Sequence, residues 1–406
     1  MTTRRASWDP ARERRTGGQL PIRMLHVITR LVRGGADENT LATVRGLDPR
    51  RYVVDLAVGG GSDGGLLAEL AAHRVHRVPE LGRDPHPWND LRALLRLAAL
   101  MRRHRYQIVH THTAKAGFLG RLAAAMVGTP TIIHTVHGVT FHEHLSLASR
   151  AFYVALERIA GRFTHQFVTV GEDVKRLYLE QGIGAPALYQ TIYSGMPLDD
   201  YLEAGAMSDV ERARVRAELG LRPGDRAVAM AARLEPRKGH RDLLQVVARL
   251  SRRHPELRVL LLGEGPLRAD LEAEARALGV ADVVRFLGHR TDLPRVLAAV
   301  DVSVLTSLWE GLPRVLVQSA AAGRPVVTFD VEGAWEVVRD GHNGFIVPSR
   351  DLDHFAARLE DLLRDGTLAR DFGRAGRDQV GDAWTLETML DRLDRMYQRV
   401  VARRAA

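Results

Sequence analysis

The segment AARLEPRKGH at residues 231–240 decides the fold of this chain, because it joins a short apolar strand to a loop rich in charge. The apolar run at 227–231 predicts a β-strand, and the loop after it carries Arg233 and Lys238. Of the 58 Lys and Arg residues in the chain, only three are Lys. A compact ammonium beside a planar guanidinium suits a diphosphate. We therefore expect this loop to bind an anionic ligand.

A second loop has complementary features. The segment LWEGLP at 308–313 follows an apolar run at 302–305 and opens a helix that reaches Gln318. Pro313 suits the first position of that helix, whose free amides favour anions. Glu310 offers two carboxylate oxygens to sugar hydroxyls. Together the two loops predict a pocket for a diphosphate that carries a polyhydroxylated group, that is, a nucleotide-sugar.

Apolar, β-rich runs alternate with helical patterns along the chain, which is typical of a parallel α/β architecture. A first series of strands is predicted at residues 23–28, 52–58, 107–110, 131–135 and 165–170. A second series is predicted at 227–231, 258–262, 283–287, 302–305 and 325–329. Helices are predicted at 36–46, 117–127, 352–363 and 386–400. We predict two doubly wound parallel sheets in tandem, with ligands beyond the carboxyl ends of the strands.

The length of 406 residues favours two domains, and glycines and prolines suggest where they divide. We predict a disordered leader at 1–20, an N-terminal Rossmann-like acceptor-side domain at 21–200, a linker at 201–224 and a C-terminal Rossmann-like nucleotide-sugar donor domain at 225–384. The last helix, 385–406, is expected to pack back on the N-terminal domain. The two domains are expected to face a central cleft.

Composition excludes several classes of protein. The chain has no cysteine, so disulfides, thiolate metal sites and cysteine nucleophiles are excluded. No apolar run of about 18 residues is present, so no segment is expected to cross a bilayer. The net charge of +9 is spread along the chain and only 6% of residues are aromatic, which argues against nucleic acid as a partner. We expect a cytoplasmic protein. A basic amphipathic helix at 90–104 leaves peripheral contact with the inner face of the membrane as an alternative.

Five segments together resemble one family, the retaining glycosyltransferases of family 4, which adopt the two-Rossmann-domain architecture called GT-B. Their order spans nearly the whole chain from about residue 23 onward. The segments are Gly34-Gly35, His137-Gly138, Arg233 with Lys238, GEGP at 263–266, and the run from Glu310 to Gln318.

This resemblance implies an enzyme of the EC 2.4 type that moves a sugar from a nucleoside-diphosphate sugar to an acceptor hydroxyl and keeps the anomeric configuration. The expected pathway is polysaccharide or glycolipid biosynthesis. A UDP-sugar is the donor that the family most often uses, and the resemblance implies no cofactor and no metal. The acceptor stays open between a glycan, a lipid-linked molecule and a small molecule.

The resemblance also assigns roles to residues. Arg233 and Lys238 would neutralise the diphosphate as the sugar leaves. Glu310 would bind sugar hydroxyls, and His137 would lie beside the donor sugar. These four residues, Arg233, Lys238, Glu310 and His137, form the predicted catalytic set. The predicted donor-binding set is Gly34, Gly35, Arg233, Lys238, Glu264, Arg290, Glu310, Gly311, Leu312, Arg314, Val315 and Gln318.

One position departs from the family pattern. The second glutamate of the motif, eight residues after Glu310, is replaced here by Gln318. An amide keeps one acceptor oxygen for a ribose hydroxyl but loses the charge. This change keeps open a non-catalytic nucleotide-sugar-binding subunit. A nucleotide-sugar epimerase on the same fold is a second alternative, because it would use the same donor pocket without an acceptor. Turnover of donor without acceptor would identify an epimerase.

Two patterns that could suggest a metal are interpreted otherwise. The segment HTVHGVTFHEH at 134–144 is rich in histidine but lacks the HExxH spacing. For His142 and His144 in this segment two alternatives stay open: they line the acceptor side, or they are simply exposed. Asp351 and Asp353 precede an apolar-periodic helix, where acidic residues favour the positive helix end. We predict no metal site.

Overall fold

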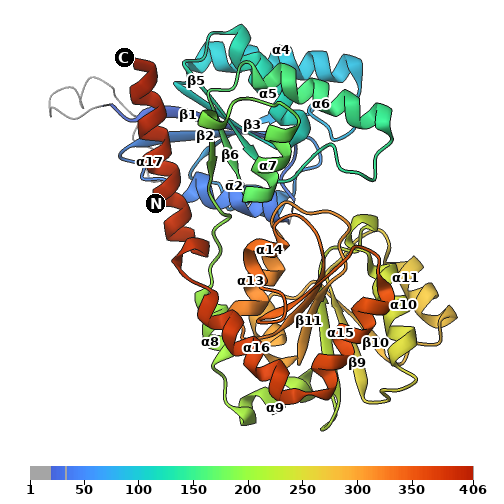
Figure 1. Ribbon diagram of the computed structural model, residues 1–406. Helices are drawn as coiled ribbons and strands as arrows, with labels where there is room; N and C mark the ends of the chain where they lie inside the picture. Colours follow the sequence, from blue (N-terminus) through green and yellow to red (C-terminus); the bar gives the residue numbers. More distant parts are fainter. Residues whose placement is uncertain (1–19, 33, 406) are drawn as a thin grey trace, which may run out of the picture.

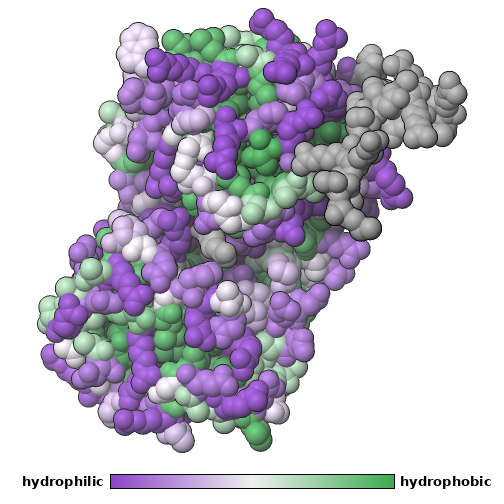
Figure 2. Space-filling view, turned by 180° about the vertical axis from the view of Figure 1, so that it is seen from behind, coloured by the Kyte–Doolittle hydropathy of each residue, from purple (hydrophilic) through white to green (hydrophobic). Residues whose placement is uncertain are grey.

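The structure is a computed structural model that describes residues 20–32 and 34–405. The predicted leader at 1–20 therefore lies outside the described residues, apart from Leu20. Figure 1 shows two lobes stacked end to end, each with strands at its centre and helices outside. The two lobes are also distinct in the space-filling view, where polar residues cover most of the visible face (Figure 2). Each lobe contains one parallel sheet, so the predicted α/β fold with two Rossmann-like parts is confirmed.

The N-terminal lobe is built on a seven-stranded sheet in the order β3-β2-β1-β4-β5-β6-β7, with every neighbouring pair parallel. Its central strands are almost entirely buried, which is expected for a parallel sheet that helices cover on both faces. The strands are β1 (Ile22–Ile28), β2 (Tyr52–Gly59), β3 (Arg74–Val78), β4 (Ile108–His112), β5 (Thr131–Val136), β6 (Gln166–Thr169) and β7 (Tyr189–Thr191).

Helices cover both faces of this sheet. One core cluster joins α2 to the strands, and another joins α4 and α5 to the opposite face. These helices are α2 (Gly35–Gly46), α3 (Gly64–Ala68), α4 (Pro87–His104), α5 (Ala114–Met126), α6 (Leu147–Gly161) and α7 (Glu172–Glu180), with the short 3-10 turn η1 (Pro186–Leu188).

The C-terminal lobe has a six-stranded parallel sheet in the order β10-β9-β8-β11-β12-β13. Its strands are β8 (Arg226–Ala231), β9 (Leu257–Leu262), β10 (Val284–Gly288), β11 (Val302–Leu305), β12 (Val326–Phe329) and β13 (Gly344–Val347). Three strands were not predicted from the sequence. The edge strands β3 and β7 are short and polar, and β13 has only four residues and begins with glycine, so each gives a weak strand pattern.

Seven helices of this lobe follow β8 in the described chain. They are α10 (His240–Leu250), α11 (Arg268–Ala277), α12 (Leu293–Ala299), α13 (Arg314–Ala321), α14 (Ala334–Val337), α15 (Leu352–Arg364) and α16 (Gly366–Gln379), together with the 3-10 turns η2 (Pro236–Lys238) and η3 (Asp382–Trp384). The predicted capping role of Asp351 is confirmed, because its Oδ1 accepts a hydrogen bond from the His354 amide at 3.0 Å.

The segment 201–224, expected as a linker, contains regular structure. Most of α8 (Asp199–Gly205) and all of α9 (Asp209–Glu218) lie in it, and both pack against α12. Arg212 and Arg216 of α9 pair with Asp301 at the start of β11. These two helices therefore belong structurally to the C-terminal lobe.

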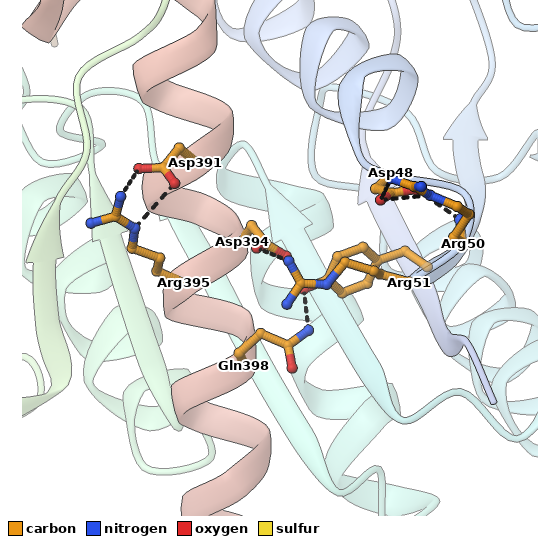
Figure 3. A network of polar contacts seen from close by, with 8 residues as sticks. Asp48, Arg50, Arg51, Asp391, Asp394, Arg395 and Gln398 are labelled. Carbon is orange, nitrogen blue, oxygen red and sulfur yellow. Dashed lines mark hydrogen bonds and ion pairs between the residues drawn. The ribbon is translucent and has the colours of Figure 1, made fainter. Parts of the chain in front are cut away.

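The last helix, α17 (Leu386–Ala405), crosses from the C-terminal lobe to the N-terminal one (Figure 1). Its buried side chains join the core formed by α2 and the first sheet. Polar contacts fix it to the β2 side: Arg51 pairs with Asp394, and Tyr52 donates to Asp394 at 2.6 Å (Figure 3). Gln398 donates to the Tyr52 hydroxyl at 2.8 Å. The chain end is thus part of the N-terminal lobe.

Candidate active site

A buried ion pair between Glu310 and Lys238 forms the centre of the site. The two loops are neighbours because β8 and β11 pair in the middle of the second sheet. Nζ of Lys238 donates to Oε1 of Glu310, and Nη1 of Arg237 donates to Oε2 at 3.2 Å. Burial favours the neutral acid, but the charges of Lys238 and Arg237 outweigh it and hold the pKa of Glu310 below its usual range. Glu310 is therefore a carboxylate.

Gly239 allows the two loops to approach this closely. Its φ is 65°, and an added Cβ would lie 1.9 Å from the carbonyl oxygen of Thr306. Both the backbone conformation and the space thus exclude a side chain. The Thr306 hydroxyl donates to the Gly239 carbonyl at 2.9 Å and fixes the contact. Lys238 is held beside Glu310 as a consequence.

Arg233 lies near this pair but does not contact Glu310. Its Nη2 pairs with Oε1 of Glu235 at 2.9 Å, and the other oxygen of Glu235 lies 3.6 Å from Arg237. Glu235 therefore links the two guanidinium groups. The guanidinium that contacts Glu310 is that of Arg237, which the sequence reasoning missed although it stands next to Lys238 in the chain.

The glycines after β1 lie opposite the start of α13. An added Cβ on Gly35 would lie 3.3 Å from Cδ of Arg314, a distance tighter than ordinary contact. Nη1 of Arg314 donates to Oε2 of Glu38 at 2.6 Å and so connects the two lobes. The sequence predicted Pro313 as the first helical residue of α13, but in the structure Pro313 is the N-cap and the helix begins one residue later, at Arg314. The first-turn amides of α13 therefore begin at Arg314 and Val315.

His137 and Gly138 approach the same loop from the N-terminal lobe. An added Cβ on Gly311 would lie 1.9 Å from the carbonyl oxygen of His137, so only glycine fits at Gly311. Burial, together with the smaller effect of the positive charge of Arg314, lowers the pKa of His137 to about 3. His137 is therefore a neutral imidazole at the junction of the lobes, and its backbone carbonyl lies against Gly311 in the loop that carries Glu310.

Two more histidines reach across the junction. The His142 ring stacks on Trp309 with centroids 4.0 Å apart and planes 14° apart. Nε2 of His144 lies 3.2 Å from the carbonyl oxygen of Leu308. The segment after β5 thus covers the residues just before Glu310, and neither histidine is an isolated surface group.

Acidic residues that the sequence reasoning missed surround the junction. Oε2 of Glu332 accepts the Glu310 amide at 3.0 Å. Oδ2 of Asp173, from the N-terminal lobe, accepts the Gly333 amide at 3.1 Å. Burial raises the pKa of Asp37, at the start of α2, to about 7 against the opposing effect of nearby arginines. No motif marks these acids in the sequence, because only the fold brings them together.

Three predicted donor residues lie outside the ion-pair cluster. Glu264 is largely exposed, 3.4 Å from Arg268. Arg290 forms a two-point pair with Asp292, with distances of 2.8 and 2.6 Å. Gln318 is partly exposed on α13, one turn after Arg314. The remaining predicted residues, Leu312 and Val315, are buried beside Glu310 and at the start of α13.

A hollow of about 700 Å³ lies elsewhere, where the chain crosses between the lobes. It is lined by the end of α2, the start of α17 and residues 196–199, and it includes none of the predicted site residues. Charged groups from several loops converge instead around Glu310, at the carboxyl ends of both sheets. In doubly wound proteins this is where ligands bind. The candidate site is therefore the junction of the lobes at Glu310.

Two facing Rossmann-like lobes, with cations and a buried carboxylate where they meet, define a protein of the GT-B fold. Residues 34–192 match the model of the glycosyl transferase 4-like domain, and residues 211–379 match that of glycosyl transferases group 1. The two matches together cover most of the chain. The chain belongs to the glycosyltransferases that are built from these two domains.

Curated relatives and solved structures agree with this family. The chain is 27% identical over 327 residues to the UDP-Gal:alpha-D-GlcNAc-diphosphoundecaprenol alpha-1,3-galactosyltransferase of Escherichia coli, with 80% of this chain and 83% of the relative covered. It is 29% identical to the putative glycosyltransferase EpsD of Bacillus subtilis, with 76% and 82% covered. The Anabaena HepE structure in complex with UDP-glucose superposes with a TM-score of 0.77 at 22% identity, covering 93% of this chain and all of the other. That likeness supports the fold.

Proposed function

We propose that this glycosyltransferase moves a sugar from a UDP-sugar to a hydroxyl of a lipid-linked glycan and retains the anomeric configuration. The observation that carries the proposal is the buried carboxylate of Glu310, held between Lys238 and Arg237 where the two lobes meet. A buried carboxylate beside cations suits a ligand that offers hydroxyls at one end and phosphate at the other.

The cations would act on the leaving group. As the bond between the anomeric carbon and the phosphate oxygen breaks, negative charge develops on the diphosphate. Lys238, Arg237 and Arg233, with the first amides of α13, would stabilise that charge without reorganising. Four positive or partly positive groups can do the work that a divalent cation does in other enzymes, so we propose that transfer needs no metal.

The acceptor would react on the face that the leaving group departs from. The acceptor oxygen bonds to the anomeric carbon of an oxocarbenium-like state, and the departing phosphate oxygen takes its proton. This same-face displacement retains configuration and needs no protein nucleophile. Glu310 would hold the sugar hydroxyls, and His137 would orient the sugar from the opposite lobe. Positioning and charge stabilisation are then the contributions of the protein.

The choice of substrate rests on the relatives. The Escherichia coli relative is named for UDP-Gal and a diphosphoundecaprenol acceptor, and a Rhizobium meliloti relative for lipopolysaccharide core biosynthesis. The Anabaena HepE structures are described as complexes with UDP, with UDP and glucose, and with UDP-glucose. Gln318 would meet the ribose with one acceptor oxygen and no charge. The Escherichia coli, Bacillus subtilis and Rhizobium meliloti relatives are all named as transferases, which does not favour the epimerase alternative.

The test is a donor panel followed by product analysis. UDP-glucose, UDP-galactose and UDP-N-acetylglucosamine are each incubated with an undecaprenyl-diphosphate-linked sugar, with and without EDTA. We expect a transferred sugar whose anomeric proton coupling matches that of the donor, and the same rate in EDTA. An inverted product would refute retention. Donor turnover without acceptor would identify an epimerase, and binding without turnover would identify a non-catalytic subunit.

We also propose that the N-terminal lobe contacts the membrane that carries such an acceptor. None of the helices in the described part of the chain combines the length and apolar character needed to span a bilayer. Exposed apolar side chains instead lie on α4 and α6. These two helices pack on either side of α5 (Figure 1). They are Trp88, Leu91, Leu95, Leu147, Phe152 and Ile159. Arginines lie among them on α4, which favours anionic lipid.

Vesicle flotation tests this surface. We expect binding to vesicles rich in phosphatidylglycerol and little binding to pure phosphatidylcholine. Replacing Trp88 and Leu95 with serine should remove most of the bound fraction. The control is Trp335→Ser, because Trp335 is similarly exposed but lies on the C-terminal lobe. Equal loss in the control would refute a specific surface.

A further inference from the structure

A row of three histidines runs from the core of the N-terminal lobe to the junction of the lobes at Glu310. Nδ1 of His26 lies 2.9 Å from Nε2 of His112, and Nδ1 of His112 lies 3.0 Å from Nε2 of His137. His26 is on β1 and His112 ends β4, while His137 follows β5. The register pairs His26 with His110 and His112 with Thr135, so each ring of the row lies two residues beyond the strand partner of the ring before it, and the row runs diagonally across the strands. His26 and His112 are fully buried, whereas His137 is partly exposed.

At the inner end of this row, the direction of the hydrogen bond between His26 and Met24 is fixed. Nε2 of His26 lies 3.1 Å from Sδ of Met24. A thioether sulfur accepts hydrogen bonds and cannot donate them. The proton of His26 therefore belongs on Nε2, which leaves Nδ1 of His26 as an acceptor.

The proton positions of the other two rings follow from that of His26. An acceptor at Nδ1 of His26 requires the proton of His112 on Nε2, and this leaves Nδ1 of His112 as the next acceptor. His137 must then carry its proton on Nε2. Each neutral imidazole has one donor and one acceptor nitrogen, so the choice at Met24 determines all three tautomers.

We propose that Met24, His26 and His112 are positioning residues that fix the tautomer of His137, so that its unprotonated Nδ1 is presented as a hydrogen-bond acceptor toward a hydroxyl of the donor sugar. The part about the sugar rests on the proposed function. The part about the tautomer does not, because it follows from the contacts alone.

The row transmits a tautomer only while its rings stay neutral. Burial lowers the pKa of His26 to about 3 and that of His137 to about 3, and it lowers the pKa of His112 well below its usual value. A protonated ring would place two donors against each other and break the alternation. Neutral rings across physiological pH keep it intact.

A metal could compete for the same nitrogens. His26, His110 and His112 form the one group in the described part of the chain whose ligand atoms are close enough to share an ion. However, His110 bonds to Tyr397 and Thr135, each at 2.7 Å, and the other two rings bond to each other and to their neighbours. All six ring nitrogens already have partners, so we favour the hydrogen-bonded row.

The experiment reads the tautomer directly. The full-length protein is labelled with ¹⁵N-histidine, and two-bond ¹H–¹⁵N correlation spectra are recorded, with His137 assigned by loss of its signals in His137→Gln. We expect a protonated Nε2 and an unprotonated Nδ1 on His137. In Met24→Leu, which removes the sulfur acceptor at similar volume, the row should reverse and place the proton of His137 on Nδ1, since a buried N–H without an acceptor is disfavoured.

The matched control is Met101→Leu, since Met101 is equally buried in the same lobe. It should leave the His137 pattern unchanged. Met24→Leu should also lower kcat/KM for the donor about two- to tenfold, the effect of one neutral hydrogen bond. A protonated Nδ1 in the native protein, an unchanged pattern in folded Met24→Leu, or shifts of His26 and His112 with stoichiometric Zn²⁺ would each overturn the proposal. The tautomer spectra and the Zn²⁺ titration need no turnover, so they can fail separately from the proposed function.

Discussion

At the scale of single residues, the site depends on charges that are stable only as a group. Glu310 and Lys238 are both nearly buried, and either alone would be an uncompensated charge in a medium of low dielectric. Arg237 and the Glu332 carboxylate complete the set. Such an arrangement contributes little net stability compared with an apolar core. Its presence is better explained by a ligand that needs the charges.

Glu310→Gln tests this interpretation. The amide keeps the shape but loses the charge that balances Lys238 and that holds sugar hydroxyls. We expect kcat to fall about 10²- to 10³-fold, the usual effect of removing one preorganised polar group. Initial rates with the donor found in the panel are the measurement. The control is Glu360→Gln on α15, where the carboxylate is equally buried and also ion-paired. A fall of the same size in the control would indicate a structural cause.

Asp37 gives a prediction for stability against pH. Its pKa rises from 3.8 to about 7 in the folded protein, chiefly because it is buried. The folded state therefore binds a proton that the unfolded state releases, and the free energy of unfolding falls as pH rises from about 4 to about 7. The shift corresponds to roughly 4 kcal/mol at most. Asp37→Asn should remove this slope in urea unfolding followed between pH 5 and 8. A slope unchanged from the native protein would contradict it.

At the scale of elements, one helix, α17, joins the two lobes. α17 leaves the C-terminal lobe after η3 and supplies buried residues to the core of the N-terminal lobe. Its polar anchor, Asp394, receives bonds from Arg51 and Tyr52 (Figure 3). The covalent connection at residues 192–198 and this helix give two crossings between the lobes, which limits how they can move relative to each other.

Two neighbouring positions on α17 should behave very differently. Met396 is fully buried, so Met396→Ala should cost about 2–5 kcal/mol of unfolding free energy. Arg395 forms an exposed pair with Asp391, so Arg395→Ala should cost less than about 1 kcal/mol. Urea unfolding monitored by far-UV circular dichroism measures both. Similar costs for the two would mean that α17 does not dock as described.

At the scale of the whole molecule, contacts between the lobes bring the halves of the site together. Arg314 pairs with Glu38, His142 stacks on Trp309, and Asp173 accepts the Gly333 amide. Two of these contacts are polar, and polar contacts between domains of one chain are compatible with domain motion. Closure over a bound donor would exclude water and prevent hydrolysis.

Donor binding should therefore stabilise the molecule as a whole. At about 100 times Kd, a UDP-sugar should add roughly 2.7 kcal/mol to the free energy of unfolding and raise the melting temperature. Lys238→Met should abolish the rise by removing a diphosphate contact. Lys115→Met is the matched control, because Lys115 is equally buried and pairs with Asp90. A rise retained in Lys238→Met would remove Lys238 from the donor site.

The sequence by itself determined the two parallel sheets and the loops that carry Lys238 and Glu310. Apolar runs, glycines and charged loops are local features, and parallel strands place such loops at the same sheet edge. Only the tertiary structure decided that Arg237 contacts Glu310 and that Asp37 is buried. It also placed His26, His112 and His137 in a row. These relations join residues far apart in the chain, and no local pattern encodes a distance across strands or between lobes.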